Sequence, residues 1–199
     1  MLFSASLVFL SIQSLFAGPF GIEKGMTYEQ IESISESAPR YVMENVYQIT
    51  PPKTHEMFEK YYVRIDPDYG VYWLKCVGYE IDTDVYGNSL KSELENLVEI
   101  IRKSYGKELF RVDELREDSK LIDPEDFMYA LYVEDRELYV IWSRIDRDGN
   151  FALQPSKLPD ELSYIFVHVL AESDTSGFVG LEYNFSNKAL VEAKRESMF

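Results

Sequence analysis

Apolar residues recur at helical spacing in one long stretch near the middle of the chain. Six of them fall on one side of a helix: Leu90, Leu94, Leu97, Val98, Ile101 and Tyr105. Charged residues occupy the other side, and Gly106 follows at a position that commonly ends a helix. The pattern predicts an amphipathic helix that covers a sheet with its apolar side.

Two shorter helices are predicted nearer the ends of the chain. Thr27 is followed three residues later by Gln30, a spacing that forms a capping box, so a helix is expected over residues 28–36. Near the other end, Asn187 is expected to cap a helix that runs to about Arg195.

Seven runs rich in aromatic and β-branched residues predict strands. They cover residues 41–49, 60–65, 71–81, 127–133, 137–145, 164–171 and 178–185. Most neighbouring runs are joined by short links without a helix, which favours antiparallel pairing. Residues 111–126 hold many acids and few large apolar residues, so a long surface connection, with room for a helical turn, is expected there.

These elements together predict an α+β fold. We expect a largely antiparallel sheet of about six to seven strands, with two or three helices packed on one face. The sequence shows no internal repeat, and residues 18–199 are enough to bury one core. A single α+β domain is therefore expected over residues 18–199.

Residues 1–17 carry no charge and run directly into Gly18 and Pro19. An apolar segment of this length is short for a membrane span, and it ends on the small residue Ala17. The pattern predicts a signal peptide over residues 1–17, cleaved after Ala17, and hence a periplasmic or secreted protein. The usual basic start of such a signal is missing, which a start site placed too far downstream would explain. Two alternatives stay open: a buried N-terminal element of the domain and an uncleaved anchor.

The chain is strongly acidic, with 35 acidic and 20 basic residues and a net charge of −15. Such a field repels nucleic acid and anionic membrane surfaces, and no basic run offsets it. Stable membrane insertion after signal cleavage is not expected either. The acidity suits the solubility of an exported protein, and it would also attract a basic partner or cations.

The motifs of the common metal, nucleophile and phosphate sites are missing: HExxH, GxSxG, the P-loop, GxGxxG and CxxC. Cys76 is the only cysteine, so no internal disulfide is expected, and its strand-like surroundings indicate a buried thiol. The two histidines are His55, in a loop, and His168, in a predicted strand beside Tyr164 and Phe166. No catalytic, cofactor-binding or metal-binding residue is assigned, and no cofactor is expected.

Aspartate pairs separated by one residue recur at three places: Asp66/Asp68, Asp82/Asp84 and Asp146/Asp148. Carboxylates at this spacing can chelate calcium, but they are also typical of turns. The nearest approach to a calcium loop begins at Asp146. It lacks the EF-hand pattern because its glycine comes at the fourth position and Lys157 stands at the twelfth. Turns are the favoured interpretation, with a calcium-stabilised domain as a minor hypothesis.

Aromatic residues make up 15% of the chain, with 15 tyrosines and the two tryptophans Trp73 and Trp142. Tyr and Trp rings can stack on sugars, and two carboxylates held across a cleft could hydrolyse a glycan. The same rings suit the core and rim of a sheet, and most of them alternate within predicted strands. We favour packing, and keep a glycan-binding or carbohydrate-active protein as the alternative function.

The segment PFGIEKGMTYEQI, from Pro19 to Ile31, resembles the PFG-x-x-x-GM-[S/T] start of the mature chain in an uncharacterised family of bacterial exported proteins. Shorter pieces are similar too: Pro51-Pro52 ahead of Phe58-Glu59-Lys60-Tyr61, Tyr105-Gly106-Lys107, and Leu181-Glu182-Tyr183-Asn184-Phe185. The helix start also resembles, more distantly, BamE/SmpA-like and beta-lactamase-inhibitor-like envelope modules. Those are binding modules, so the resemblance implies an exported, non-enzymatic protein. The lipobox cysteine and the disulfide pattern are absent, so it implies no functional residue.

We therefore expect a non-catalytic protein-binding module of the cell envelope or secreted space. Its partner is expected to be another protein, and the net charge would favour a basic one. Binding is expected to use a sheet edge or an aromatic surface.

Overall fold

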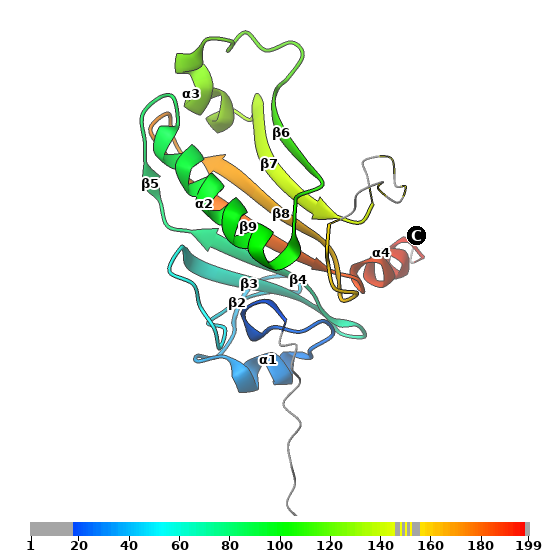
Figure 1. The fold of residues 1–199 in the computed structure, drawn as a ribbon. Helices are drawn as coiled ribbons and strands as arrows, with labels where there is room; N and C mark the ends of the chain where they lie inside the picture. Colours follow the sequence, from blue (N-terminus) through cyan, green and yellow to red (C-terminus); the bar gives the residue numbers. More distant parts are fainter. Residues whose placement is uncertain (1–17, 146–147, 149, 151, 153–155, 198–199) are drawn as a thin grey trace, which may run out of the picture.

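A sheet of nine strands, paired antiparallel throughout, forms the centre of the structure (Figure 1). The computed structural model describes residues 18–145, 148, 150, 152 and 156–197, so the predicted signal peptide over residues 1–17 lies outside the described residues. The strand order is β1-β2-β3-β4-β9-β8-β7-β6, and β5 pairs with the start of β9. The predicted α+β class and antiparallel sheet are confirmed. The strands span Arg40–Met43 (β1), Val46–Ile49 (β2), Phe58–Asp66 (β3), Gly70–Gly78 (β4), Ile81–Asp82 (β5), Phe110–Leu115 (β6), Arg136–Ser143 (β7), Leu162–Ala171 (β8) and Ser176–Phe185 (β9).

Three α-helices of the described chain cover one face of this sheet. The long helix α2 (Asn88–Tyr105) lies across β8 and β9 (Figure 1), and α3 (Phe127–Tyr132) contacts β7 and β8. The first helix, α1 (Tyr28–Ile34), packs against β2, where the rings of Tyr28 and Tyr47 lie 5.1 Å apart. Short 3-10 turns, η1 (Pro19–Gly21) and η2 (Pro124–Asp126), precede α1 and α3.

The hydrophobic core fills the space between these helices and the sheet. Trp142 on β7 is fully buried in it, and its indole N–H donates a hydrogen bond of 2.9 Å to the carbonyl of Gly106 at the end of α2. Leu94 and Leu97 of α2 are buried against the same core. The indole bond satisfies a polar group inside an apolar site and fixes the end of the helix to the sheet.

The last helix, α4 (Lys188–Glu196), lies on the opposite side of the sheet from α2. Lys188 donates a hydrogen bond of 2.9 Å to the hydroxyl of Tyr164, which points away from the core because its neighbour Ile165 points into it. The side chain of Val191, which belongs to α4, is fully buried. The expectation that the helices pack on one face is therefore wrong for α4.

Asn187 stands at the predicted start of this last helix, but it does not cap it with its side chain. Its amide nitrogen donates instead to the carbonyls of Tyr69 and Val71, at 2.8 and 2.9 Å. The side chain thus joins the helix start to the turn between β3 and β4. The sequence thus predicted correctly that Asn187 stands at the start of the helix, but the prediction that it caps the helix was wrong.

The predicted strand over residues 41–49 is a hairpin of β1 and β2. Met43 pairs with Val46, and the two residues between them, Glu44 and Asn45, form the turn. Asn45 adopts a left-handed conformation with φ of 60°, which Asn tolerates better than most residues. The aromatic and β-branched run hid this turn because only Asn45 signals it.

Two predictions between residues 111 and 133 were wrong. Residues 127–133 were predicted as a strand, but a capping box of Asp123 and Asp126 with Pro124 begins a helical turn that continues into α3. Residues 111–126 were predicted as a connection, but they contain most of the edge strand β6. An edge strand tolerates acids such as Asp113 because one side of it faces solvent.

These differences raise the described strands to nine and the α-helices to four, where six to seven strands and two or three helices were expected. The capping box of Thr27 and Gln30 is confirmed, with hydrogen bonds of 2.8 and 3.3 Å between backbone and side chain. The long central helix also lies where its apolar spacing predicted it.

Candidate functional site

The face of the sheet opposite α2 carries large side chains, and among the described residues only the helix α4 packs against it, at one end. We call it the open face and define it by three rows of residues that are paired across the strands. The first row is Val46, Arg64, Trp73, Asn184, Tyr164 and Ser143. The second is Gln48, Tyr62, Lys75, Glu182, Phe166, Ile141 and Phe110. The third is Lys60, Val77, Gly180, His168, Tyr139 and Val112.

Alternation along the strands puts these side chains on one face. In β8, Ile165 and Val167 point into the core, so Phe166 and His168 point to the open face. The prediction that His168 shares a face with Tyr164 and Phe166 is confirmed. The pairing register of the strands therefore decides which side chains face the helices and which lie on the open face. A shift of one residue in that register would move every side chain of a strand to the other face.

The carboxylate of Glu182 is the centre of the open face. Its two oxygens accept hydrogen bonds from the indole N–H of Trp73 at 2.8 Å and from the ammonium group of Lys75 at 3.0 Å. His168 Nε2 lies 3.6 Å from the same carboxylate, just beyond hydrogen-bond length. Burial alone would raise the pKa of Glu182, but His168, the Lys75 charge and the Trp73 N–H outweigh it and lower the pKa to about 2.

The imidazole of His168 occupies the space that Gly180 leaves on the neighbouring strand. A Cβ atom on Gly180 would lie 2.3 Å from His168 Nε2, which no real contact allows. Phe166 stacks on the imidazole, with ring centroids 4.9 Å apart, and Tyr139 lies 5.3 Å from Phe166. An aromatic layer of Tyr139, Phe166 and His168 thus covers the open face over β7 and β8.

Arg64 lies over one face of the Trp73 ring. Its guanidinium carbon lies 4.8 Å from the centre of the indole ring, in a cation–π contact. No carboxylate among the described residues forms an ion pair with Arg64, and its Nε is buried without a hydrogen-bond partner. An arginine without a carboxylate is unexpected in so acidic a chain.

Unpaired polar atoms concentrate on the open face. Of six buried side-chain nitrogen and oxygen atoms without a hydrogen-bond partner among the described residues, three belong to Arg64 and Asn184 of the open face, and a fourth, His168 Nε2, faces the Glu182 carboxylate at 3.6 Å. Asn184 is fully buried, and neither its amide nitrogen nor its amide oxygen has a partner. Buried polar groups are nearly always paired, so this concentration marks the open face as the part of the structure that is not optimised for stability alone.

The charge of the open face differs from that of the whole chain. Its three rows contain one acid, Glu182, and the bases Lys60, Arg64 and Lys75, while the next row on this face, beyond Val112 and Tyr139, consists of the acids Glu114 and Glu137. The sequence as a whole has 35 acids and 20 bases. A locally basic, aromatic surface on an acidic protein favours contact with acidic groups.

Cys76 and His55, the other side chains considered for chemistry, lie away from the open face. Cys76 is fully buried in the core, and burial raises the pKa of its thiol well above the usual range. Nδ1 of His55 accepts a hydrogen bond from the backbone of Met57 at 3.2 Å. The structure does not bring His55 and Cys76 together with His168 into one site.

Of the described aspartate pairs, Asp66/Asp68 forms a turn, whereas in Asp82/Asp84 the first residue lies in strand β5 and the second lies before α2. Asp66 accepts hydrogen bonds from the backbone N–H groups of Asp68 and Tyr69, and Asp84 accepts from the N–H of Asn88 at the start of α2. No group of three or more potential metal ligands occurs among the described residues. Asp146, the start of the nearest approach to a calcium loop, lies outside the described residues.

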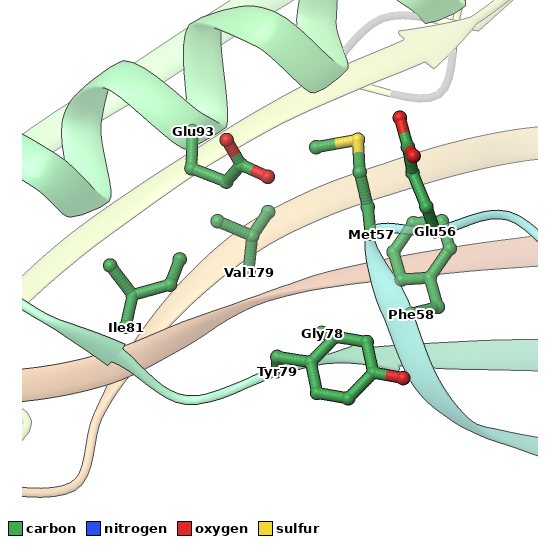
Figure 2. Close-up of a pocket in the computed structure, with 8 residues that line it drawn as sticks. All are labelled: Glu56, Met57, Phe58, Gly78, Tyr79, Ile81, Glu93 and Val179. Carbon is green, nitrogen blue, oxygen red and sulfur yellow. The ribbon is translucent and has the colours of Figure 1, made fainter.

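Two small hollows lie on the helix-covered side. Figure 2 shows the smaller, of about 90 Å³, where Val179 and Met57 lie between the carboxylates of Glu93 and Glu56. The larger, of about 190 Å³, lies between η1 and α2 and is lined mainly by apolar side chains, with His55 among them. Neither hollow gathers unpaired polar groups, so neither rivals the open face.

The two outer strands of the sheet carry different protection against edge pairing. β1 exposes Tyr41 and Met43, but it is four residues long, follows Pro39 and contains a bulge. These features discourage the addition of another strand. β6 carries Arg111 and Asp113, which pair with acids and bases on neighbouring elements. A sheet edge is therefore a weaker candidate than the open face.

A second exposed apolar patch surrounds α3. Its members are Ile122, Tyr129, Tyr132 and Val133. All four are exposed, and their side chains are ordinary surface aromatic and aliphatic groups. We treat it as the rival surface in the tests below.

Comparison with protein-family models, with curated proteins and with solved structures finds no match for this chain. Among the described residues, no helix combines the length and the apolar composition that crossing a membrane requires. The candidate site therefore rests on its geometry.

Sequence analysis did not identify the open face as a site. Trp73, Lys75, His168 and Glu182 lie up to 109 residues apart in the chain, as in the Trp73–Glu182 hydrogen bond. Each is unremarkable in its own strand. The alternation in residues 164–170 predicted that His168 shares a face with aromatic residues. It did not predict which strands lie next to the strand of His168.

We expect Glu182→Gln to reduce the stability of the protein in a pH-dependent way. The folded-state pKa of Glu182 lies below its ordinary value of 4.5, so its stabilisation is fully present above pH 4.5 and is lost as the pH falls toward 2. The shift corresponds to about 3 kcal/mol. Chemical unfolding of both proteins between pH 7 and pH 2 checks this, and a difference that stays constant with pH would contradict it.

We expect Asn184→Leu to leave the free energy of unfolding unchanged or to raise it by about 1 kcal/mol. The substitution removes two buried polar atoms that have no partner and adds apolar volume of similar size. Urea unfolding measures it. Asn184→Asp is the matched comparison, because it places a charge at the same buried position and should destabilise strongly; a loss of stability in Asn184→Leu would mean that the amide is paired in solution.

Proposed function

We propose that this chain is an exported, non-catalytic protein that binds another protein through the open face of its sheet. The observation that carries the proposal is Arg64, a half-buried guanidinium on that face that has no ion-pair partner among the described residues. A half-buried cation without a counter-ion costs free energy, and a bound partner that supplies a carboxylate recovers that free energy.

The chemistry of Glu182 supports binding over catalysis. A carboxylate that accepts hydrogen bonds from Trp73 and Lys75 and has a pKa of about 2 remains an anion at neutral pH. It is suited to act as a counter-ion that holds neighbouring strands together, and it is unsuited to act as a general acid. Cys76, with a raised pKa inside the core, is likewise unsuited to act as a nucleophile.

The aromatic side chains favour a protein over a glycan as the partner. Trp142 is fully buried and offers no platform to a sugar ring, and Arg64 covers one face of the half-buried Trp73 indole. The three rows of the open face contain one carboxylate, whereas glycoside hydrolysis needs two. Arg, Tyr and Trp at a surface are typical of protein interfaces.

Net charge and local charge act at different ranges in this proposal. The net charge of −15 governs long-range attraction and favours a basic partner. The contact surface itself carries Lys60, Arg64 and Lys75, so the groups that touch it are expected to include acids. A partner with an acidic docking segment on an otherwise basic protein satisfies both.

We expect the exported chain to begin at Gly18. The full chain, produced with its own leader in a bacterial host that has a periplasm, would be recovered from the periplasmic and extracellular fractions, and its intact mass would be measured. Removal of residues 1–17 after Ala17 is the expected result. A mass that retains residues 1–17, or a chain confined to the cytoplasm, would contradict export through this leader.

We expect Tyr62→Ser on the open face to weaken the binding of a protein partner about tenfold or more, since it removes an aromatic contact from the proposed interface. The C-terminally tagged chain would capture its partner from a native envelope extract. The partner would be identified by mass spectrometry, purified and titrated against each variant by calorimetry. Tyr129→Ser on α3 is the matched control, because it makes the same substitution at an exposed site far from the open face.

Equal binding by Tyr62→Ser and the unaltered chain would contradict the proposal. Loss of binding in Tyr129→Ser instead would move the interface to the patch around α3. If the extract yields no stoichiometric protein partner and the open face binds oligosaccharides, the alternative function as a glycan-binding protein would replace this one.

A further inference from the structure

We propose that Arg64, stacked on Trp73, is the point at which the open face receives a carboxylate group of the bound protein. The inference rests on the proposed function and names the chemistry of the contact. It predicts an acidic side chain, Asp or Glu, in the segment of the partner that docks here.

Arg64 differs from the other bases of the open face because no acid pairs with it. Lys75 forms an ion pair with Glu182 at 3.0 Å, and Lys60 forms one with Glu59 at 3.0 Å. Arg64 forms no ion pair or hydrogen bond through its side chain with the described residues, and its Nε is buried. A half-buried guanidinium that lacks a counter-ion is a strong site for an incoming anion.

The contact with Trp73 prepares Arg64 for this role. The guanidinium lies over the indole ring, 4.8 Å from its centre, while the indole N–H is held by Glu182. Lys75 in turn holds Glu182. The aromatic platform is therefore fixed before binding, and less side-chain entropy is lost when a carboxylate arrives.

The charge around Arg64 favours a carboxylate over a phosphate. A single unpaired cation matches the single charge of a carboxylate, and Glu182 is an anion bonded to the indole against which Arg64 packs. The net charge of −15 adds a further penalty for a dianion.

The two tryptophans provide a direct measurement of this contact. Only Trp73 and Trp142 contribute indole N–H signals to the NMR spectrum, since the chain has two tryptophans. Trp73 lies under Arg64, whereas Trp142 is fully buried in the core and bonded to Gly106. The first signal reports binding at Arg64, and the second reports whether the fold is intact.

The experiment titrates the full mature chain with capped tetraglutamate, using capped tetraglutamine as the uncharged control peptide. Oligogalacturonate and inorganic phosphate test whether another source of anion occupies the site. Arg64→Gln removes the guanidinium, and Arg64→Lys keeps the charge without the planar fork. Arg116→Gln is the matched control, because Arg116 is an exposed arginine outside the open face.

We expect tetraglutamate, and not tetraglutamine, to shift the Trp73 signal in a saturable way. Arg64→Gln should abolish the shift, Arg64→Lys should weaken binding about tenfold, and Arg116→Gln should leave it unchanged. The Trp142 signal should stay in place in every variant. Binding should weaken as salt is added, because the contact lies at a half-exposed surface.

A tetraglutamate shift that persists in Arg64→Gln would overturn the inference, as would the absence of any shift. If oligogalacturonate or phosphate shifts the Trp73 signal and tetraglutamate does not, the claim that the carboxylate belongs to a protein would be overturned. Titration of the captured protein partner distinguishes the proposed protein-binding function from the role of Arg64 as the carboxylate site. If the partner binds Arg64→Gln as well as the unaltered chain, the proposed function stands and the role of Arg64 fails. If no partner exists but tetraglutamate binds at Arg64, the proposed function fails, and Arg64 is a carboxylate site without a protein partner.

Discussion

Burial of one face of the antiparallel sheet beneath α1, α2 and α3 is the constraint on which the rest of the structure depends. Burying each large apolar side chain contributes about 1.5–3 kcal/mol, so the register that places Ile165 and Leu181 against α2 is strongly preferred. The same register dictates what appears on the opposite side. Phe166 and Glu182 face outward because their neighbours face inward, and the open face is thus a consequence of the core.

The open face combines one well-satisfied group with several unsatisfied ones. Glu182 is bonded from two sides and stays ionised, which joins β4 to β9 and brings β8 close through His168. Arg64 and Asn184, in the row beside it, lack partners. A surface selected for stability alone would pair or replace such groups. The contrast between the two neighbouring rows is the physical basis for treating this face as a binding surface.

Predictions from local pattern succeeded where the signal was local. The capping box at Thr27, the spacing of α2 and the alternation in β8 and β9 follow from contacts a few residues apart. Predictions failed where one residue outweighed a run of strand-forming neighbours, as Asn45 did in the hairpin of β1 and β2 and Pro124 did before α3. The acids of β6 led to the prediction of a surface connection in place of a strand, because an edge strand tolerates acids that a central strand would not.

The amino-acid sequence by itself determined the α+β class, the antiparallel pairing and the side of each central strand that faces the core, because these depend on periodicity and short connections. Only the tertiary structure decided which strands became neighbours. The order β4-β9-β8 places Trp73 and Lys75 beside Glu182 and His168, more than 90 residues away in the chain. Strand order is set by packing of the whole sheet, and no local pattern encodes it.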